Sequence, residues 1–290
     1  TGVQTCALPI CQPLGFVEAL LQAPPQIGRY QQRGGRIGGH GVILVRMAIG
    51  KVYLVGAGPG DPGLITLRAV EILRRADVVL YDYLVNPAVL RHCPRDVLLI
   101  SLGKHGQGRV ATQDQVNERL VMLSQLHPTV VRLKSGDPMV FGRAGEELDC
   151  LTQHGIPFEI VPGVTSGLAA ASYTGIPATN RDAASAVALV TGQEDAEKVD
   201  STLDFAALAR FPGTLVFYMG VTTAAHWSNA LVAAGKPRET PVAIVRHVSL
   251  PDQSRIDTTL GELGNVVAAR HLRPPVVFIV GEDRKSTRLN

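Results

Sequence analysis

The sequence predicts an α/β fold in which strands and helices alternate along the chain. From Gly50 onward, short runs rich in valine, isoleucine and leucine are separated by segments with helical periodicity. The strand runs are apolar throughout, which is typical of sheets covered by helices on both faces. Hydrophobic residues make up 46% of the 290 residues, so the chain can bury a sizeable core without disulfides or metal.

The first half of this region holds a regular series of elements. The strand at 52–55 is a β-branched run, and the helix at 64–75 repeats apolar residues every three to four positions. The helix at 113–126 places Val116, Leu120 and Leu123 on one face and stops before Pro128. The other predicted elements are strands at 78–81, 98–102, 129–133 and 158–161, a helix at 146–154 and a small-residue helix at 166–173.

The same rhythm continues in the second half. Strands are predicted at 187–190, 215–218, 241–245 and 276–280, and helices at 205–210, 223–234 and 260–270. A stretch rich in proline, glycine and threonine, 175–181, is the best candidate boundary between two domains, 49–180 and 181–283. Residues 1–48 lack sustained periodicity, so we expect this leader and the tail 284–290 to be non-native or disordered.

Charge and composition exclude several classes of protein. Residues 1–46 carry a net charge of +3 and residues 282–290 of +1, which leaves residues 47–281 near −1. The body is therefore not basic, and no nucleic-acid partner is expected. No apolar run reaches about 18 residues, so no membrane span is predicted. Cys93 and Cys150 lie far apart, which argues against a zinc site and suits the reducing cytoplasm.

The first strand runs into a glycine-rich loop, 56–63. Such a turn at the carboxyl end of a strand is a common ligand site in α/β sheets. A dinucleotide fingerprint would need glycine at position 61, where Asp61 stands. Pro59 and Pro62 also remove amide donors that a phosphate would use. Two interpretations remain: a loop that brings its backbone close to a large or flat ligand, and a plain strand-to-helix turn.

A second loop, 132–143, follows a predicted strand in the same way. Gly136 permits close backbone approach and Asp137 offers a carboxylate, which suits the adenosine and ammonium parts of a nucleoside–amino-acid cofactor. Arg132, Lys134 and Arg143 are cations suited to substrate carboxylates. The alternative is a solvated turn with a helix-capping aspartate.

Single residues at other strand ends complete the candidate site. Thr165 and Ser166 open the small-residue helix, where they can cap it or bind a ligand. Asp82 and Lys104 follow neighbouring predicted strands and could manage protons, although either could equally be a surface charge. Met219 ends another strand, and its thioether suits an adenine or a sulfonium neighbour, although methionine is more often a core residue.

In their order and spacing, 56–63, 132–143, 162–166 and 218–220 closely resemble the tetrapyrrole methylases, the class III S-adenosylmethionine-dependent methyltransferases. The pairs Tyr81-Asp82 and Gly103-Lys104 favour those members that methylate uroporphyrinogen III. The resemblance covers about 49–283. It implies two αβα domains with the active site in the cleft between them, in a homodimer.

The resemblance also implies roles for particular residues. Its cofactor contacts fall on Pro59, Ser135, Gly136, Asp137, Val140, Thr165, Ser166, Met219, and backbone near Val248 and Pro275. Asp82 aligns with the proton acceptor and Lys104 with the proton donor. We expect Arg132, Lys134, Arg143 and Arg181 to bind the substrate carboxylates. The chain departs from the family pattern at Ser135, usually glycine, which fits if its φ is negative, and at Pro275, commonly alanine.

The expected reaction is methylation of uroporphyrinogen III at carbon, giving precorrin-1 and then precorrin-2 for sirohaem or cobalamin synthesis. One alternative is a methylase of the same family that acts on a later precorrin. Another is a nicotinamide-binding oxidoreductase, which Asp61 and the two prolines disfavour. A binding module without enzymatic activity is the third.

Overall fold

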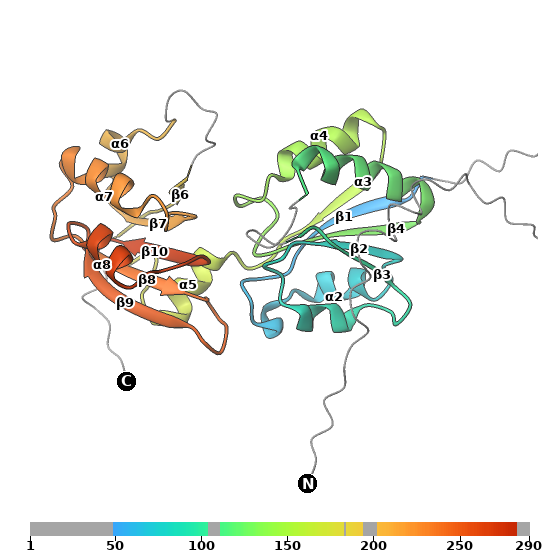
Figure 1. The fold of residues 1–290 in the computed structure, drawn as a ribbon, viewed down its shortest axis with the longest axis horizontal. Helices are drawn as coiled ribbons and strands as arrows, with labels where there is room; N and C mark the ends of the chain where they lie inside the picture. Colours follow the sequence, from blue (N-terminus) through green and yellow to red (C-terminus); the bar gives the residue numbers. More distant parts are fainter. Residues whose placement is uncertain (1–48, 104–110, 183, 194–201, 283–290) are drawn as a thin grey trace, which may run out of the picture.

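The structure is a computed structural model that describes residues 49–103, 111–182, 184–193 and 202–282. It contains two five-stranded sheets, which form two units side by side (Figure 1). The predictions for the leader, 1–48, and for the tail, 284–290, fall outside the described residues. Among the helices described, none is long and apolar enough to cross a membrane.

The first sheet is parallel throughout, with the strand order β3-β2-β4-β1-β5. Its strands are β1 Lys51–Gly56, β2 Val78–Tyr81, β3 Leu98–Ser101, β4 Thr129–Lys134 and β5 Phe158–Val161. Because all five run the same way, their carboxyl ends lie at one edge of the sheet. That edge is where the sequence places its polar and glycine-rich loops.

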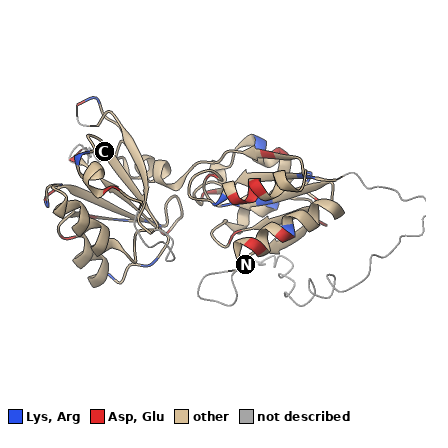
Figure 2. Ribbon diagram, turned by 90° about the horizontal axis from the view of Figure 1, so that it is seen from above, with Lys and Arg blue, Asp and Glu red and all other residues tan. Residues whose placement is uncertain are grey.

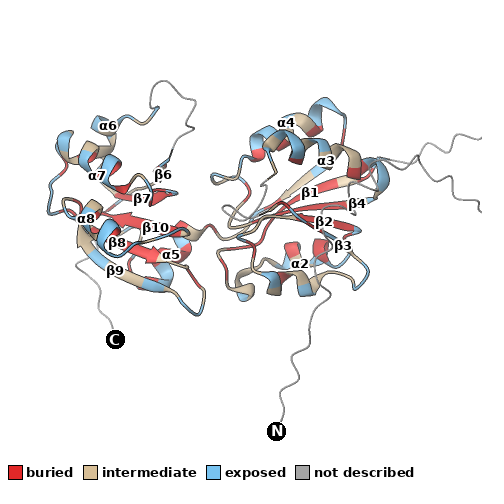
Figure 3. Cartoon of the chain, in the orientation of Figure 1, coloured by how far each residue is buried: buried red, intermediate tan, exposed pale blue. Residues whose placement is uncertain are grey.

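Helices cover both faces of this sheet (Figure 1). On one face lie α3 Gln113–Leu126 and α4 Ala144–Gln153, whose Leu120 and Leu151 pack against Val52 and Leu54. On the other face lie α2 Leu67–Leu73 and the short 3-10 helices η1 Pro62–Leu64 and η2 Pro87–His92. Figure 3 shows the buried residues concentrated along the strands between these layers. The predicted two-sided cover is confirmed for this sheet.

The strands and helices predicted in the first half are present with small shifts in their ends. The predicted helix at 64–75 is shorter, because the Thr66 side chain caps α2 by accepting from Ala69 N–H and Pro62 starts a separate η1 turn. The α3 helix begins at a capping box in which Thr112 and Gln115 bond each other's backbone N–H.

The second sheet has the order β6-β7-β10-β8-β9 and mixes strand directions. Its strands are β6 Val187–Thr191, β7 Thr214–Tyr218, β8 Pro241–Arg246, β9 Ser254–Thr259 and β10 Val276–Val280. Only β6 and β7 pair in parallel, and the other neighbours are antiparallel. The sequence did not predict β9, because its polar residues are exposed or half-buried at the sheet edge and carry no apolar run.

One face of the second sheet carries α5 Ser166–Thr174, and the other carries α6 Phe205–Arg210, α7 Ala224–Ala233 and α8 Leu263–Ala269. Trp227 of α7 stacks on Phe217 with ring centroids 4.1 Å apart and is fully buried. The alanines of α5 pack against Val216, Ala243 and Val277. Since α5 belongs to the second core, we propose a division between the units at 162–165 rather than at the predicted 180/181.

Candidate functional site

Three strand ends of the first sheet meet at glycines. Gly58 and Gly136 exchange backbone hydrogen bonds of 3.2 and 2.8 Å, which join the loop after β1 to the loop after β4. A Cβ on Gly56 would lie 2.6 Å from the Cα of Gly163 and 2.7 Å from the carbonyl oxygen of Gly136. Because these contacts are with backbone, only glycine fits at position 56. Three loops that are separate in the sequence therefore form one surface.

The Asp137 carboxylate fastens two of these loops together. Its Oδ1 accepts from Met139 N–H at 2.8 Å, and its Oδ2 accepts from Gly163 N–H at 3.0 Å. Gly136 has a φ of +67°, whereas Ser135 is not among the described non-glycine residues with positive φ. The condition under which serine fits position 135 is therefore met, and the run 135–137 offers backbone rather than a free carboxylate.

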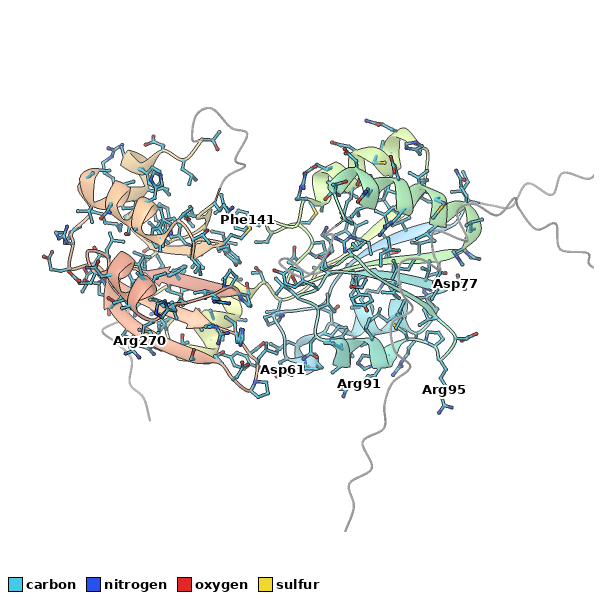
Figure 4. The ribbon with its side chains drawn as sticks, viewed as in Figure 1. Asp61, Asp77, Arg91, Arg95, Phe141 and Arg270 are labelled. Carbon is cyan, nitrogen blue, oxygen red and sulfur yellow. The ribbon has the colours of Figure 1, made fainter. Side chains whose placement is uncertain are left out.

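The first loop also contacts the second unit. Asp61 N–H donates to Ser249 Oγ at 2.9 Å, and Tyr173 O–H donates to Asp61 Oδ2 at 2.9 Å. The hydrogen bond from Gly63 N–H, followed by that from Tyr173, lowers the pKa of Asp61. In Figure 4, Asp61 and Phe141 both lie where the two units face each other. Asp61 thus links the units and caps η1.

The second sheet contributes one edge to this junction. Because β7 and β8 both run antiparallel to β10, Met219, Val248 and Pro275 lie at the same edge. Met219 is 49% exposed and has a φ of +55°. Val248 is buried, and its carbonyl lies near Gly60, next to Pro59. The Pro275 carbonyl accepts from His247 N–H at 3.3 Å.

Thr165 and Tyr218 connect the start of α5 to β7. Their hydroxyl oxygens are 2.8 Å apart, and Gly167 N–H donates to the Tyr218 oxygen at 2.9 Å. Burial raises the pKa of Tyr218, although both hydrogen bonds act in the opposite direction. Thr165 makes no side-chain cap, so the predicted capping alternative is wrong for this residue. Ser166 and Val140 are half-buried beside it.

The predicted cofactor residues therefore come from both units and gather where the two sheet edges meet. A separate surface hollow of about 600 Å³ lies between α3 and α4, and it is lined by acidic side chains such as Asp114, Glu118 and Asp149. It includes none of the predicted site residues. Within the described ranges, no three His, Cys, Asp or Glu side chains are arranged to hold a metal ion.

The structure corrects the roles expected of Arg132 and Lys134. Both side chains lie on the face of β4 that α3 and α4 cover, and their residues are only 4% and 2% exposed. Arg132 Nε and Lys134 Nζ bind the fully buried Glu147 at 2.9 and 2.8 Å. Their charges are therefore used inside the fold and are not available to substrate carboxylates.

The other predicted polar residues are placed differently. The Asp82 side chain is 29% exposed, and its Oδ1 accepts from Arg132 Nη2 at 2.7 Å. Arg143, the last residue of the second loop, is exposed and pairs with Glu146 at 2.7 Å. Arg181 is exposed. Lys104 lies outside the described residues. Figure 2 shows acidic and basic residues interspersed on the helices of the first unit.

Sequence reasoning missed Glu147, Tyr218 and Phe141. Glu147 shares a helix face with Ala144 and Leu151, both buried, so a carboxylate on that face was the available signal. Tyr218 carries no signal in the sequence beyond its place at the end of a predicted strand. Phe141 is 40% exposed and lies 5.0 Å, between ring centroids, from Tyr218.

The chain is similar in sequence to one protein family and to curated proteins whose sequences match most of its length. The profile of the family described as Tetrapyrrole (Corrin/Porphyrin) Methylases matches residues 51–264. A siroheme synthase from Zymomonas mobilis is 46% identical over 233 residues, which is 80% of this chain and 49% of that protein. One from Stutzerimonas stutzeri is 45% identical over 81% of this chain and 50% of that protein. The chain thus spans about half the length of these curated relatives.

Solved structures extend the match. The uroporphyrin-III C-methyltransferase of Thermus thermophilus, complexed with S-adenosylhomocysteine, is 41% identical with a TM-score of 0.71, covering 81% of this chain and 99% of that one. A cobalt precorrin-4 methyltransferase is 29% identical with a TM-score of 0.70, covering 80% and 94%. These likenesses confirm the fold expected from the sequence.

Proposed function

The chain belongs to the tetrapyrrole methylase family, and from that membership we propose that it transfers methyl groups from S-adenosylmethionine to carbon atoms of uroporphyrinogen III. The products are precorrin-1 and then precorrin-2, on the routes to sirohaem and cobalamin. The observation that carries the proposal is the meeting of three glycine-containing strand ends with the sheet edge that presents Met219. The similarity to a uroporphyrin-III C-methyltransferase across 99% of that chain supports it.

The residues at the junction fit S-adenosylmethionine. The backbone of Gly136 carries no side chain, and a Cβ placed there would only reach ordinary contact with Thr165 Cα at 3.8 Å, so the run 135–137 presents uncrowded backbone. The half-exposed Met219 supplies a soft, polarizable surface for adenine or the sulfonium. We assign the adenosine and amino-acid parts to backbone of Pro59, the run 135–137 and Pro275, with Val140, Thr165, Ser166, Met219 and Val248 beside them.

When bound, S-adenosylmethionine supplies an activated methyl group, so the protein's main task is alignment. The loops that would present it are joined to one another, since backbone hydrogen bonds connect Gly58 to Gly136 and the Asp137 carboxylate accepts from Gly163 in the next loop. Holding two reactants in line can contribute several kcal/mol, up to about 7–11 kcal/mol in favourable cases.

Methylation at carbon requires a proton to leave the macrocycle. Asp82 is the proposed base, because it follows β2 at the active edge and remains 29% exposed. Lys104 is the proposed proton donor by its family position alone. For the substrate carboxylates, the exposed Arg143 and Arg181 remain as candidates. The Arg143–Glu146 pair is exposed and therefore weak enough to exchange for a substrate carboxylate.

The test is direct. Purified protein is mixed with uroporphyrinogen III and S-adenosylmethionine, and the formation of S-adenosylhomocysteine and the absorbance of precorrin-2 are followed. We expect two methyl transfers per macrocycle. Turnover of a later precorrin without turnover of uroporphyrinogen III would overturn the proposed substrate. Binding of NAD in place of S-adenosylhomocysteine would overturn the proposed class.

We further propose that the chain works as a homodimer in the cytoplasm. Sedimentation tests the oligomeric state.

A further inference from the structure

A buried charge network lies beneath the proposed active site. We define it by its four members, which are Asp82, Arg132, Lys134 and Glu147. Arg132 is its centre, since Nη2 binds Asp82 Oδ1 at 2.7 Å and Nε binds Glu147 Oε1 at 2.9 Å. Lys134 Nζ lies 2.8 Å from both oxygens of Glu147. Two cations thus face two anions, and only Asp82 reaches solvent.

The burial follows from the strand. Alternate residues of β4 point to the same face, so Val130, Arg132 and Lys134 all point toward α3 and α4. A charge in that layer is costly unless an opposite charge compensates it. Glu147 of α4 is 0% exposed and is the group that contacts both cations. Arg132 Nε binds Glu147 and Nη1 donates to the Leu133 carbonyl at 3.3 Å, while Nη2 binds Asp82.

We propose that Glu147 is a positioning residue for Asp82: it orients Arg132 and balances the two buried cations, so that Asp82 remains a base strong enough to accept the substrate proton. This inference rests on the proposed function, because it takes Asp82 as the base. Without the carboxylate of Glu147, both cations would act on Asp82 with no second anion to offset them, which would weaken Asp82 as a base. The catalytic role stays with Asp82, the group proposed to contact the substrate.

The charged neighbours of Asp82 are consistent with this balance. Within the part of the chain that the structure describes, they are Arg132 and Lys134 from β4, Glu147 acting through Arg132, and Tyr83 beside Asp82. Burial and then the charge of Arg132 lower the pKa of Lys134, and Glu147 opposes them. Burial would also lower the pKa of Arg132, but Asp82 and Glu147 raise it overall.

The first experiment measures the coupling without turnover. The carboxyl-carbon NMR signal of Asp82 is titrated in the wild type, in Glu147→Gln and in Lys134→Met. Loss of the anion should move the Asp82 midpoint down by about 1 pH unit, and loss of the cation should move it up by a similar amount. The pair variant Lys134→Met/Glu147→Gln should return it toward the wild type. Asp149→Asn also replaces a carboxylate of α4 with an amide, but at an exposed position, and should leave the Asp82 midpoint unchanged.

The second experiment uses the reaction. In Glu147→Gln we expect kcat at neutral pH to fall by about 3- to 10-fold. The acidic limb of the kcat profile should move to lower pH, and KM for S-adenosylmethionine should stay within twofold. Asp149→Asn should match the wild type in all three.

The outcomes separate the two proposals. If the variants shift the Asp82 midpoint as expected but the wild type does not turn over uroporphyrinogen III, the proposed function is overturned and the Glu147–Asp82 coupling stands. Unchanged midpoints, or shifts of the same sign in both single variants, overturn the positioning role, because a residue needed only for folding would not produce opposite shifts. If Glu147→Gln does not fold, Lys134→Met alone decides, and a midpoint that does not rise contradicts the inference.

Discussion

At the residue scale, the size of single side chains decides which loops can lie in contact at the candidate site. Gly56 and Gly163 let the loops touch through their backbones, because a Cβ at either position would collide with backbone of another loop. Gly136 is favoured for another reason, its φ of +67°. Met219 is the opposite case, since a large apolar side chain is left half-exposed at the edge of the second sheet. In both cases the residue type follows from what must fit beside it.

Replacing Gly56 with alanine should lower the free energy of unfolding by about 2 kcal/mol, because the new Cβ would collide with backbone of Gly163 and Gly136. Denaturant unfolding measures the change. The control is Gly145→Ala in α4, where a Cβ meets nothing within 4 Å. That variant should be stabilised by up to about 1 kcal/mol, because alanine is the better helix former. Equal effects in the two variants would contradict the close approach.

Met219→Ala should weaken S-adenosylhomocysteine binding by about tenfold, because the thioether surface at the junction is lost. Isothermal calorimetry measures the affinity. The melting temperature should change little, since Met219 is 49% exposed. Leu126→Ala, which removes another exposed apolar side chain at the end of α3, should keep the wild-type affinity. An unchanged affinity in Met219→Ala would remove this residue from the proposed binding set.

At the scale of elements, the docking of α5 is the feature that the chain order conceals. The helix follows β5 directly, yet its alanines pack against β7, β8 and β10 of the other unit. The first turn of α5 is held by the Tyr218 hydroxyl at the end of β7. Local periodicity located α5 to within one residue, but nothing local to 166–174 identified the sheet it covers.

Tyr218→Phe should reduce stability by about 1–3 kcal/mol, because it leaves the buried Gly167 N–H and Thr165 hydroxyl without this partner. Urea unfolding provides the measurement. Tyr173→Phe is the matched control, since it removes a hydroxyl from a tyrosine that is 44% exposed. Its expected loss is below about 1 kcal/mol. A larger loss in Tyr173→Phe than in Tyr218→Phe would argue against Tyr218 as the anchor of α5.

At the scale of the whole molecule, polar contacts join the two units at Asp61. The carboxylate accepts from Gly63 and Tyr173, and the backbone N–H donates to Ser249. These contacts place the glycine-rich loop of the first sheet against the loop after β8. The junction between the units therefore depends on pairs of residues more than a hundred positions apart.

The Asp61 contacts predict an acid-dependent loss of stability. The pKa of Asp61 is lowered in the fold from its ordinary 3.8, so its contribution is present above about pH 4 and is lost as the pH falls through the lowered value. The stability difference between the wild type and Asp61→Asn should therefore shrink between pH 6 and pH 3. Chemical denaturation at both pH values tests this. A difference that is constant across this range would show that the Asp61 carboxylate is not linked to folding.

The sequence by itself determined the alternation of strands and helices, the glycine-rich strand ends and the positions of Asp82, Thr165 and Met219. These features follow from apolar periodicity and turn chemistry, which are written into neighbouring residues. The sequence did not predict β9. Its residues are exposed or half-buried at the sheet edge, so the strand needs no apolar run that periodicity could detect.

Only the tertiary structure decided the fate of the charges. From the sequence, Arg132 and Lys134 were predicted to bind substrate carboxylates. In the structure, α4 covers their face of β4 and brings Glu147 into contact with both side chains. Which side of a strand a helix covers depends on the packing of the whole unit, and the pairing of charges 13 or 15 positions apart depends on that packing. Buried charges must find partners through space, so the network beneath Asp82 became apparent only once the chain was folded.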